Sequence, residues 1–263
     1  KIAIIGHPFG LYNWYMKEGE VRLQGSKLEQ FVDRVNEKNY DYVVVTGDIV
    51  RGENPNNFNL IKEFIRALNV KKVFFAPGNH DLEYKSNIMN YSKNIGYINK
   101  NQILPGTKIS LSMINSSGTP NQSLTQKPTG FSLGKDALGI IDRLDSNLLN
   151  ILFMHHHLFW AHEKFRHVSE LDEMSKKNME IWDNKIIPKL VEKNVKLVIS
   201  GDPTCCGDFK SSINNDISIF YMTNGIPHIN NSTKWAADEI NYLELHIDGE
   251  KLVIFSIVID PNK

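Results

Sequence analysis

The chain of 263 residues carries 30 basic and 30 acidic side chains, so its formal net charge at neutral pH is zero. This balance provides no overall field to attract long nucleic acids or anionic lipids, and neither is expected as a partner. No apolar run approaches the length of about 20 residues that a membrane span needs, and no targeting segment is visible. The adjacent Cys205 and Cys206 suit a reducing compartment better than a structural disulfide, so we expect a cytoplasmic protein. The length of the chain is compatible with one domain over residues 1–263, which is what we expect.

The first two predicted strands each end in polar residues. The apolar run at residues 2–5 is typical of a strand covered on both faces, and the turn after it contains His7. A helix is predicted over residues 26–38, where apolar residues recur at helical spacing behind a capping serine. The second buried strand, residues 43–46, ends in Gly47-Asp48.

The third predicted strand leads into the most informative stretch of the chain. A helix over residues 58–68 precedes the strand at residues 72–76, which ends in Pro77 and then Gly78-Asn79-His80-Asp81. Asn79 offers a neutral oxygen, His80 a proton-carrying ring, and Asp81 an acceptor that could fix the tautomer of that ring. The same residues also suit an ordinary turn whose side chains satisfy only the local backbone.

The middle of the chain repeats this strand-end pattern. Residues 82–100 are predicted to be helical, residues 108–115 alternate like a half-buried strand, and residues 116–130 form a polar loop. A helix over residues 132–144 leads to a buried strand at residues 148–154, which ends in three histidines, His155 to His157. Histidines at the end of an apolar strand indicate a metal or phosphate role for at least one of them.

The last part of the chain adds one more such strand and then antiparallel pairing. An amphipathic segment at residues 178–193 precedes a strand at residues 195–200 that ends in Gly201-Asp202. Antiparallel strands are predicted at residues 217–223, 242–247 and 252–259, with Asp248-Gly249 as the hairpin turn between the last two.

Five predicted strand ends therefore carry candidate metal ligands. They are His7, Asp48, Asn79, His155 and Asp202. Parallel strands joined by helices bring their carboxyl ends to one edge of a sheet. This mixture of oxygen and imidazole donors suits Mn, Fe, Mg or Zn, as one or two divalent ions.

In their order and placement these motifs resemble the calcineurin-like metallophosphoesterase superfamily, whose members present Asp-x-His, Gly-Asp, Gly-Asn-His-Asp or Gly-Asn-His-Glu, His and Gly-His-x-His. Gly47-Asp48, Gly78 to Asp81, and Met154-His155-His156 match three of these motifs. The resemblance implies an α/β fold, a four-layer α/β/β/α sandwich of two mixed sheets flanked by helices. It also implies two metal ions at the strand ends, with Asp48 bridging them.

The first and last motifs depart from the family pattern. Either His7 keeps the histidine place and Ile5 replaces the aspartate, or His7 replaces the aspartate and Phe9 the histidine. In the last motif Asp202 can still bind a metal, whereas Thr204 is a poor ligand.

The departures affect the two implied ions differently. For one ion, every ligand position would still be occupied by a residue that can bind a metal: Asp48, Asn79, His155 and Asp202. The extra carboxylate favours harder ions such as Mn or Mg for that place. The other ion would keep only His7 and Asp48.

By resemblance, the chain would be a metal-dependent hydrolase that attacks a small phosphomonoester or phosphodiester with metal-activated water. His80 would stabilise the phosphoryl group or protonate the leaving oxygen, with Asp81 holding its ring. Candidate phosphate contacts are Arg51, His156, His162, Arg166 and His167. The alternatives are a catalytically silent binding or scaffold protein, favoured by the lost ligands, and a nuclease, disfavoured by the neutral charge balance.

Overall fold

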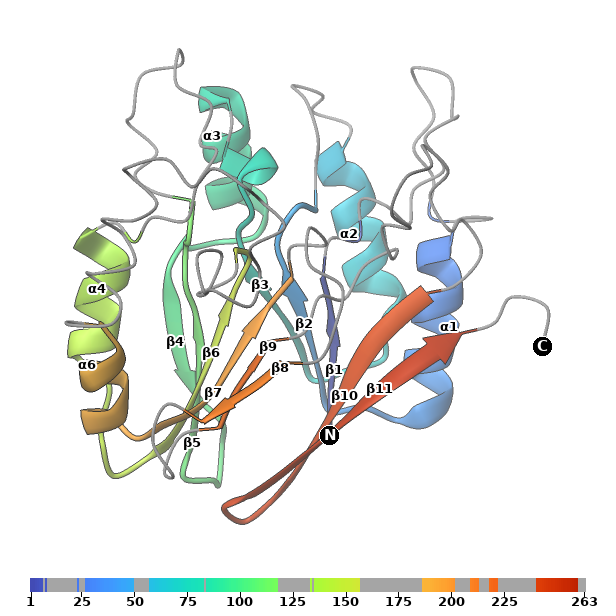
Figure 1. Ribbon diagram of the computed structural model, residues 1–263. Coiled ribbons are helices and arrows are strands. Elements are labelled where there is room, and N and C mark those ends of the chain that lie inside the picture. Colours follow the sequence, from blue (N-terminus) through green and yellow to red (C-terminus); the bar gives the residue numbers. More distant parts are fainter. Residues whose placement is uncertain are drawn as a thin grey trace, which may run out of the picture.

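The structure is a computed structural model that describes residues 1–6, 8, 23, 27–49, 57–82, 84–117, 133, 135–156, 186–201, 209–212, 218–221 and 240–259. Two β-sheets pack face to face, and helices cover their outer faces (Figure 1). This is the four-layer α/β/β/α arrangement expected from the sequence. Among the described residues, no helix has the length and apolar character needed to cross a membrane.

The first sheet has the order β11-β10-β1-β2-β3. Its parallel part consists of β1 (Ile2–Ile5), β2 (Tyr42–Thr46) and β3 (Lys72–Ala76). The hairpin of β10 (Ile240–Asp248) and β11 (Lys251–Ile259) extends it, with β10 antiparallel to β1. The sheet is therefore mixed, and the carboxyl ends of β1, β2 and β3 lie at one edge (Figure 1).

The second sheet has the order β4-β5-β6-β7. Its strands are β4 (Lys100–Ile103), β5 (Ile109–Met113), β6 (Leu149–Met154) and β7 (Val195–Ser200). The last three are parallel and β4 is antiparallel to β5, so this sheet is mixed too. A separate two-stranded sheet is formed by β8 (Phe209–Ser212) and β9 (Ser218–Tyr221).

Three apolar clusters hold the layers together. The first joins the outer face of the first sheet to α1 (Lys27–Lys38), α2 (Asn57–Ala67) and α3 (Lys85–Asn94). The second fills the space between the two sheets. The third joins the second sheet to α4 (Lys135–Asp142) and α6 (Ile187–Glu192). Because β1, β2, β6 and β7 are covered on both faces, they appear in the sequence as nearly continuous apolar runs.

Several local predictions need correction. All five residues of β5 are buried, although their alternation had predicted a half-buried strand; the Ser110 hydroxyl donates to Asn101 Oδ1 at 2.5 Å. The helix predicted to reach residue 100 ends at Asn94, and Lys100 begins β4. Asp248 pairs with Lys251, so the hairpin turn is one residue later than predicted.

Candidate metal centre

The chain leaves β2 through two consecutive residues in the left-handed region. Gly47 has φ +89° and Asp48 has φ +52°, a conformation that is uncommon for a residue with a side chain. A Cβ atom on Gly47 would lie 2.5 Å from Nδ1 of His155, so this position needs glycine for space as well as for φ. Such backbone strain is retained only where the surroundings enforce it, and here it presents Asp48 to the edge of the sheet.

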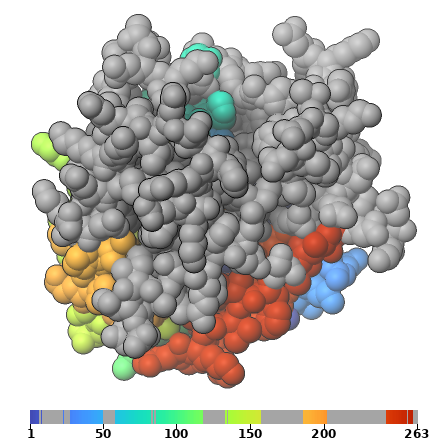
Figure 2. Space-filling view, viewed as in Figure 1, coloured from blue at the N-terminus to red at the C-terminus, as the bar shows by residue number. Residues whose placement is uncertain are grey.

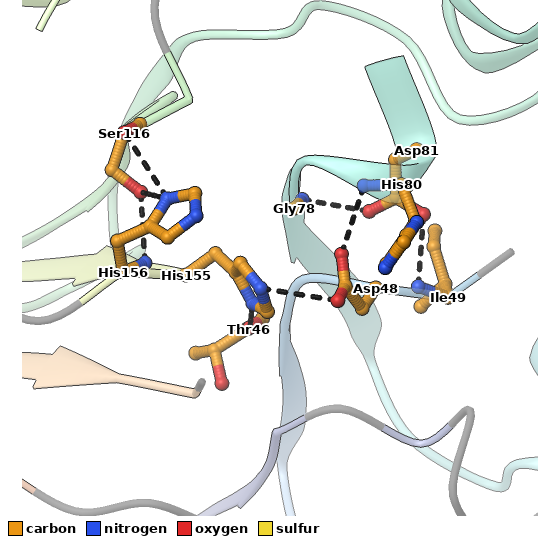
Figure 3. Close-up of polar contacts among 9 residues, drawn as sticks. All are labelled: Thr46, Asp48, Ile49, Gly78, His80, Asp81, Ser116, His155 and His156. Carbon is orange, nitrogen blue, oxygen red and sulfur yellow. Dashed lines mark hydrogen bonds and ion pairs between the residues drawn. The ribbon is translucent and has the colours of Figure 1, made fainter. Parts of the chain in front are cut away.

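Asp48 meets His155 in the interior of the protein. The two residues are 2% and 1% exposed, and Asp48 Oδ2 lies 3.2 Å from His155 Nε2 (Figure 3). His155 Nδ1 lies 3.1 Å from the carbonyl oxygen of Thr46. A carbonyl can only accept, so Nδ1 carries the proton and donates it. In the neutral ring, the lone pair of Nε2 therefore faces the carboxylate of Asp48.

This pair fits a bound divalent cation. Two acceptor atoms 3.2 Å apart repel each other unless a proton or a cation lies between them. Donors each about 2.1 Å from one ion, at angles between octahedral and tetrahedral, are separated by roughly 3.0 to 3.4 Å. A backbone carbonyl bonded to the second ring nitrogen is also the usual support of a metal-binding histidine.

The other predicted ligands follow other strands. Within the described part of the chain, no group of three or more His, Cys, Asp or Glu side chains is placed to hold an ion. Asn79, predicted as an amide ligand, lies in the turn after β3, and its carbonyl accepts the Leu82 amide at 3.2 Å. His7 and Asp202, the other predicted ligands, lie outside the described residues.

The described residues that precede these two predicted ligands nevertheless lie close to Asp48 and His155. The Thr46 hydroxyl donates to the carbonyl of Ile5 at 3.4 Å, so the end of β1, two residues before His7, lies beside the end of β2. The amide of Gly201 donates to the carbonyl of His155 at 3.0 Å, which places the residue before Asp202 at the end of β6.

Asp81 ties the exits of β2 and β3 together. It is fully buried, and its two carboxylate oxygens accept the backbone amides of Gly78 at 2.7 Å and Ile49 at 2.8 Å (Figure 3). The bond from Gly78 is the local backbone role that the sequence left open as an alternative, whereas the bond from Ile49, across the two strand exits, was not predicted. The predicted action of Asp81 on the ring of His80 stays a prediction.

The turn that carries His80 is held against Asp48. The His80 amide donates to Asp48 Oδ1 at 3.1 Å, so Asp48 lies between His155 and the His80 turn (Figure 3). A Cβ atom on Gly78 would lie 2.9 Å from Asp48 Cγ, so glycine is required for this close approach. On α3, the buried Asn87 donates its amide to the carbonyl of His80 at 3.3 Å, a further support that the sequence did not reveal.

The packing below this turn keeps a tyrosine neutral. The Tyr91 hydroxyl donates to the carbonyl of Phe75 at 3.3 Å. Burial, and then the nearby charge of Asp81, holds the pKa of Tyr91 well above its ordinary value. The phenol therefore acts as an apolar support with one hydrogen bond beneath the strand end.

His156 is fixed on the other side of His155. Its amide donates to the hydroxyl of Ser116 at 2.9 Å, and its Nδ1 lies 3.1 Å from the carbonyl of Ser116. The two histidine rings meet edge to face with centroids 4.8 Å apart, and His156 lies on the side of His155 away from Asp48 (Figure 3). A phosphate contact by His156 stays a prediction. The other predicted phosphate contacts lie outside the described residues: Arg51, His162, Arg166 and His167.

Two packed mixed sheets with a carboxylate and an imidazole at their strand ends are the framework of a metallophosphoesterase. The family model for calcineurin-like phosphoesterases matches residues 24–205, which is more than half of the chain. The protein belongs to the calcineurin-like phosphoesterase family. Membership in this family supports the general class of activity, which is metal-dependent hydrolysis of phosphate esters.

Solved structures agree with this fold. The purple acid phosphatase PPD1 from seeds of yellow lupin (Lupinus luteus) is 10% identical, with a TM-score of 0.56 over 98% of this chain and 52% of the lupin chain. GAP50, the anchor in the inner membrane complex of Plasmodium, is 15% identical, with a TM-score of 0.52 over 98% of this chain and 84% of that chain. The chain thus spans about half the length of the lupin phosphatase. No curated protein sequence matches the chain.

Proposed function

We propose that this protein is a metal-dependent hydrolase of a small phosphomonoester or phosphodiester. The observation that carries the proposal is the buried pair of Asp48 and His155, with Nε2 of the ring turned toward a carboxylate oxygen 3.2 Å away. A fold alone does not define a reaction, but this pair is the kind of site at which a phosphoesterase holds its ion.

The residues that would hold the ion are Asp48, Asn79, His155 and Asp202, with His7 and Asp48 available to a second ion. Such an ion lowers the pKa of a bound water and offsets the negative charge that develops on phosphate. The carboxylate-rich set favours Mn or Mg over Zn.

The chain itself would position His80 for the reaction. Its amide bond to Asp48 fixes the turn at the ligand, and the side chain is half-buried, so the ring can reach a substrate at the edge of the site. There it would stabilise the phosphoryl oxygens or donate a proton to the leaving oxygen. Asp81 and Asn87 would keep the turn in place through the backbone bonds that they make.

The second candidate is a catalytically silent binding protein. It is favoured by Ile5, which is 1% exposed in β1 and packs among the apolar residues beneath α1 and α2. If His7 keeps the histidine place of the first motif, an apolar side chain stands where the family has an aspartate. GAP50, described as an anchor, also has this fold, which supports this candidate for our chain.

Metal analysis combined with hydrolysis of a chromogenic phosphate ester separates the two candidates. We expect the wild type to bind a divalent ion and turn over the ester, and Asp48→Asn to lose both. His80→Ala should keep its metal and lose about 10²- to 10⁴-fold in turnover. Asp136→Asn, an exposed change on α4, is the control and should match the wild type. Bound metal without turnover above that of Asp48→Asn would favour the silent protein.

A further inference from the structure

The strand β11 forms one edge of the first sheet. It is paired along its whole length with β10, from Asp248 opposite Lys251 to Ile240 opposite Ile259. In the part of the chain that the structure describes, no strand pairs with its other side. Backbone N–H and C=O groups along such a side point outward and can form a ladder with another strand.

The edge is accessible from both faces of the sheet. Phe255 is 46% exposed and Val258 is 53% exposed. Because side chains alternate along a strand, these two residues lie on opposite faces. None of the side chains described for β11 is fully buried, and part of the β10–β11 hairpin lies at the surface in the space-filling view (Figure 2).

The composition of β11 differs from that of the edge strands β3 and β4. Residues 252–259 contain no charged residue and no proline, and all but Ser256 are apolar. The edges β3 and β4 are only five and four residues long and begin with Lys72 and Lys100. Short strands and lysines are the usual protection against edge-to-edge pairing. β11 is nine residues long, and its one lysine, Lys251, lies at its first position, which leaves residues 252–259 without this protection.

We infer that β11 pairs antiparallel with β11 of a second copy of this chain, joining the two five-stranded sheets into one. An apolar strand paired with itself about a two-fold axis places apolar side chains opposite one another on both faces. Its single charge, Lys251, lies at one end and so comes to opposite ends of the paired strands. Equal numbers of basic and acidic residues leave no net repulsion between the copies.

The length of the strand sets the strength of this contact. Nine residues span about 30 Å, so the ladder forms an interface at the small end of protein–protein contacts. We therefore expect a reversible dimer with a dissociation constant on the order of 1–100 μM.

Sedimentation equilibrium over a range of concentrations around that value tests the inference. The wild type should show a monomer–dimer equilibrium, and Phe255→Lys and Val258→Lys should each raise the dissociation constant at least about tenfold. Ile103→Lys is the matched control, because Ile103 is 50% exposed on the edge strand β4. It should dimerise like the wild type. A wild type that stays monomeric, or dimers that resist both β11 changes, would overturn the inference.

Hydrogen exchange provides a second test that does not depend on substitutions. Raising the concentration of wild-type protein through the dimerisation range should slow exchange at alternate amides of β11, those that point away from β10. The amides of β4 should be unaffected. Slowing confined to β4 or another segment, or no slowing on β11 in the dimer, would show that the two-fold contact lies elsewhere or does not form.

Discussion

Asp48 illustrates how single residues set the properties of the candidate site. Its carboxylate is buried, one oxygen accepts the His80 amide, and the other faces Nε2 of His155. A buried charge is tolerated only when hydrogen bonds and an opposite charge offset its loss of hydration. The neighbours that let Asp48 reach this position should therefore be sensitive to small changes.

Gly78→Ala should lower the free energy of unfolding by about 1–3 kcal/mol. The added Cβ would be 2.9 Å from Asp48 Cγ, so the two strand exits would have to move apart. Gly139→Ala in α4 is the control; its Cβ would meet only the flexible end of Arg143, and alanine should stabilise the helix by about 0.5–1 kcal/mol. Urea denaturation measures both, and equal effects would contradict the close approach of Gly78 to Asp48.

Asp81→Asn should lower the free energy of unfolding by about 2–4 kcal/mol. Each oxygen of Asp81 accepts one backbone amide, and the asparagine NH₂ group would face one of those donors instead of accepting from it. Asp136→Asn on the surface of α4 should change stability by less than about 0.5 kcal/mol. If thermal or urea unfolding shows the same stability for both variants, the bonds from Gly78 and Ile49 do not hold the turn.

Among the elements, β10 carries a polar network on its helix-facing side. Glu244 accepts hydrogen bonds from the Tyr40 hydroxyl and the His246 ring. Burial alone would raise the pKa of Glu244, but these bonds and the nearby Lys1 outweigh it and lower the pKa from its ordinary value of 4.5. Burial and the bond to Glu244 raise the pKa of Tyr40, which stays a neutral donor.

Glu244→Gln should therefore destabilise the protein at neutral pH and much less in acid. Because the pKa of Glu244 is lower in the folded state, its stabilisation is present above about pH 4.5 and is lost as the pH falls below that value. At neutral pH the loss should be about 1 kcal/mol for each weakened hydrogen bond. Urea denaturation of both proteins across this range measures it, and a difference that stays constant into acid would contradict the network.

The buried strands β1, β2, β6 and β7 could be predicted from the sequence because both of their faces are covered, which leaves nearly uninterrupted apolar runs. β4 and β8 could not, since a short polar edge such as Lys100–Ile103 has the composition of a loop. Asp48 and His155 were predicted as ligands because they lie within two residues of the ends of such runs. The supporting hydrogen bonds of the Thr46 carbonyl and of Asn87 were not predicted, because they depend on distances between elements that the sequence does not give.

For the whole molecule, the candidate site should couple ion binding to stability. A ligand bound only by the folded state stabilises it by about 2.7 kcal/mol at a concentration one hundred times its dissociation constant. Adding Mn²⁺ to metal-free protein should therefore raise the Tm of the wild type and leave that of Asp48→Asn unchanged. Scanning calorimetry measures both Tm values. An equal rise in the Tm of both proteins would place the bound ion away from Asp48.

The central claim is that Asp48 and His155 share a divalent ion. Anomalous diffraction from crystals grown with Mn²⁺ tests it most directly, because the method locates the ion and its ligands together. We predict an anomalous peak within bonding distance of both Asp48 Oδ2 and His155 Nε2. A direct hydrogen bond between these two atoms, with no peak beside them at saturating Mn²⁺, would contradict the account.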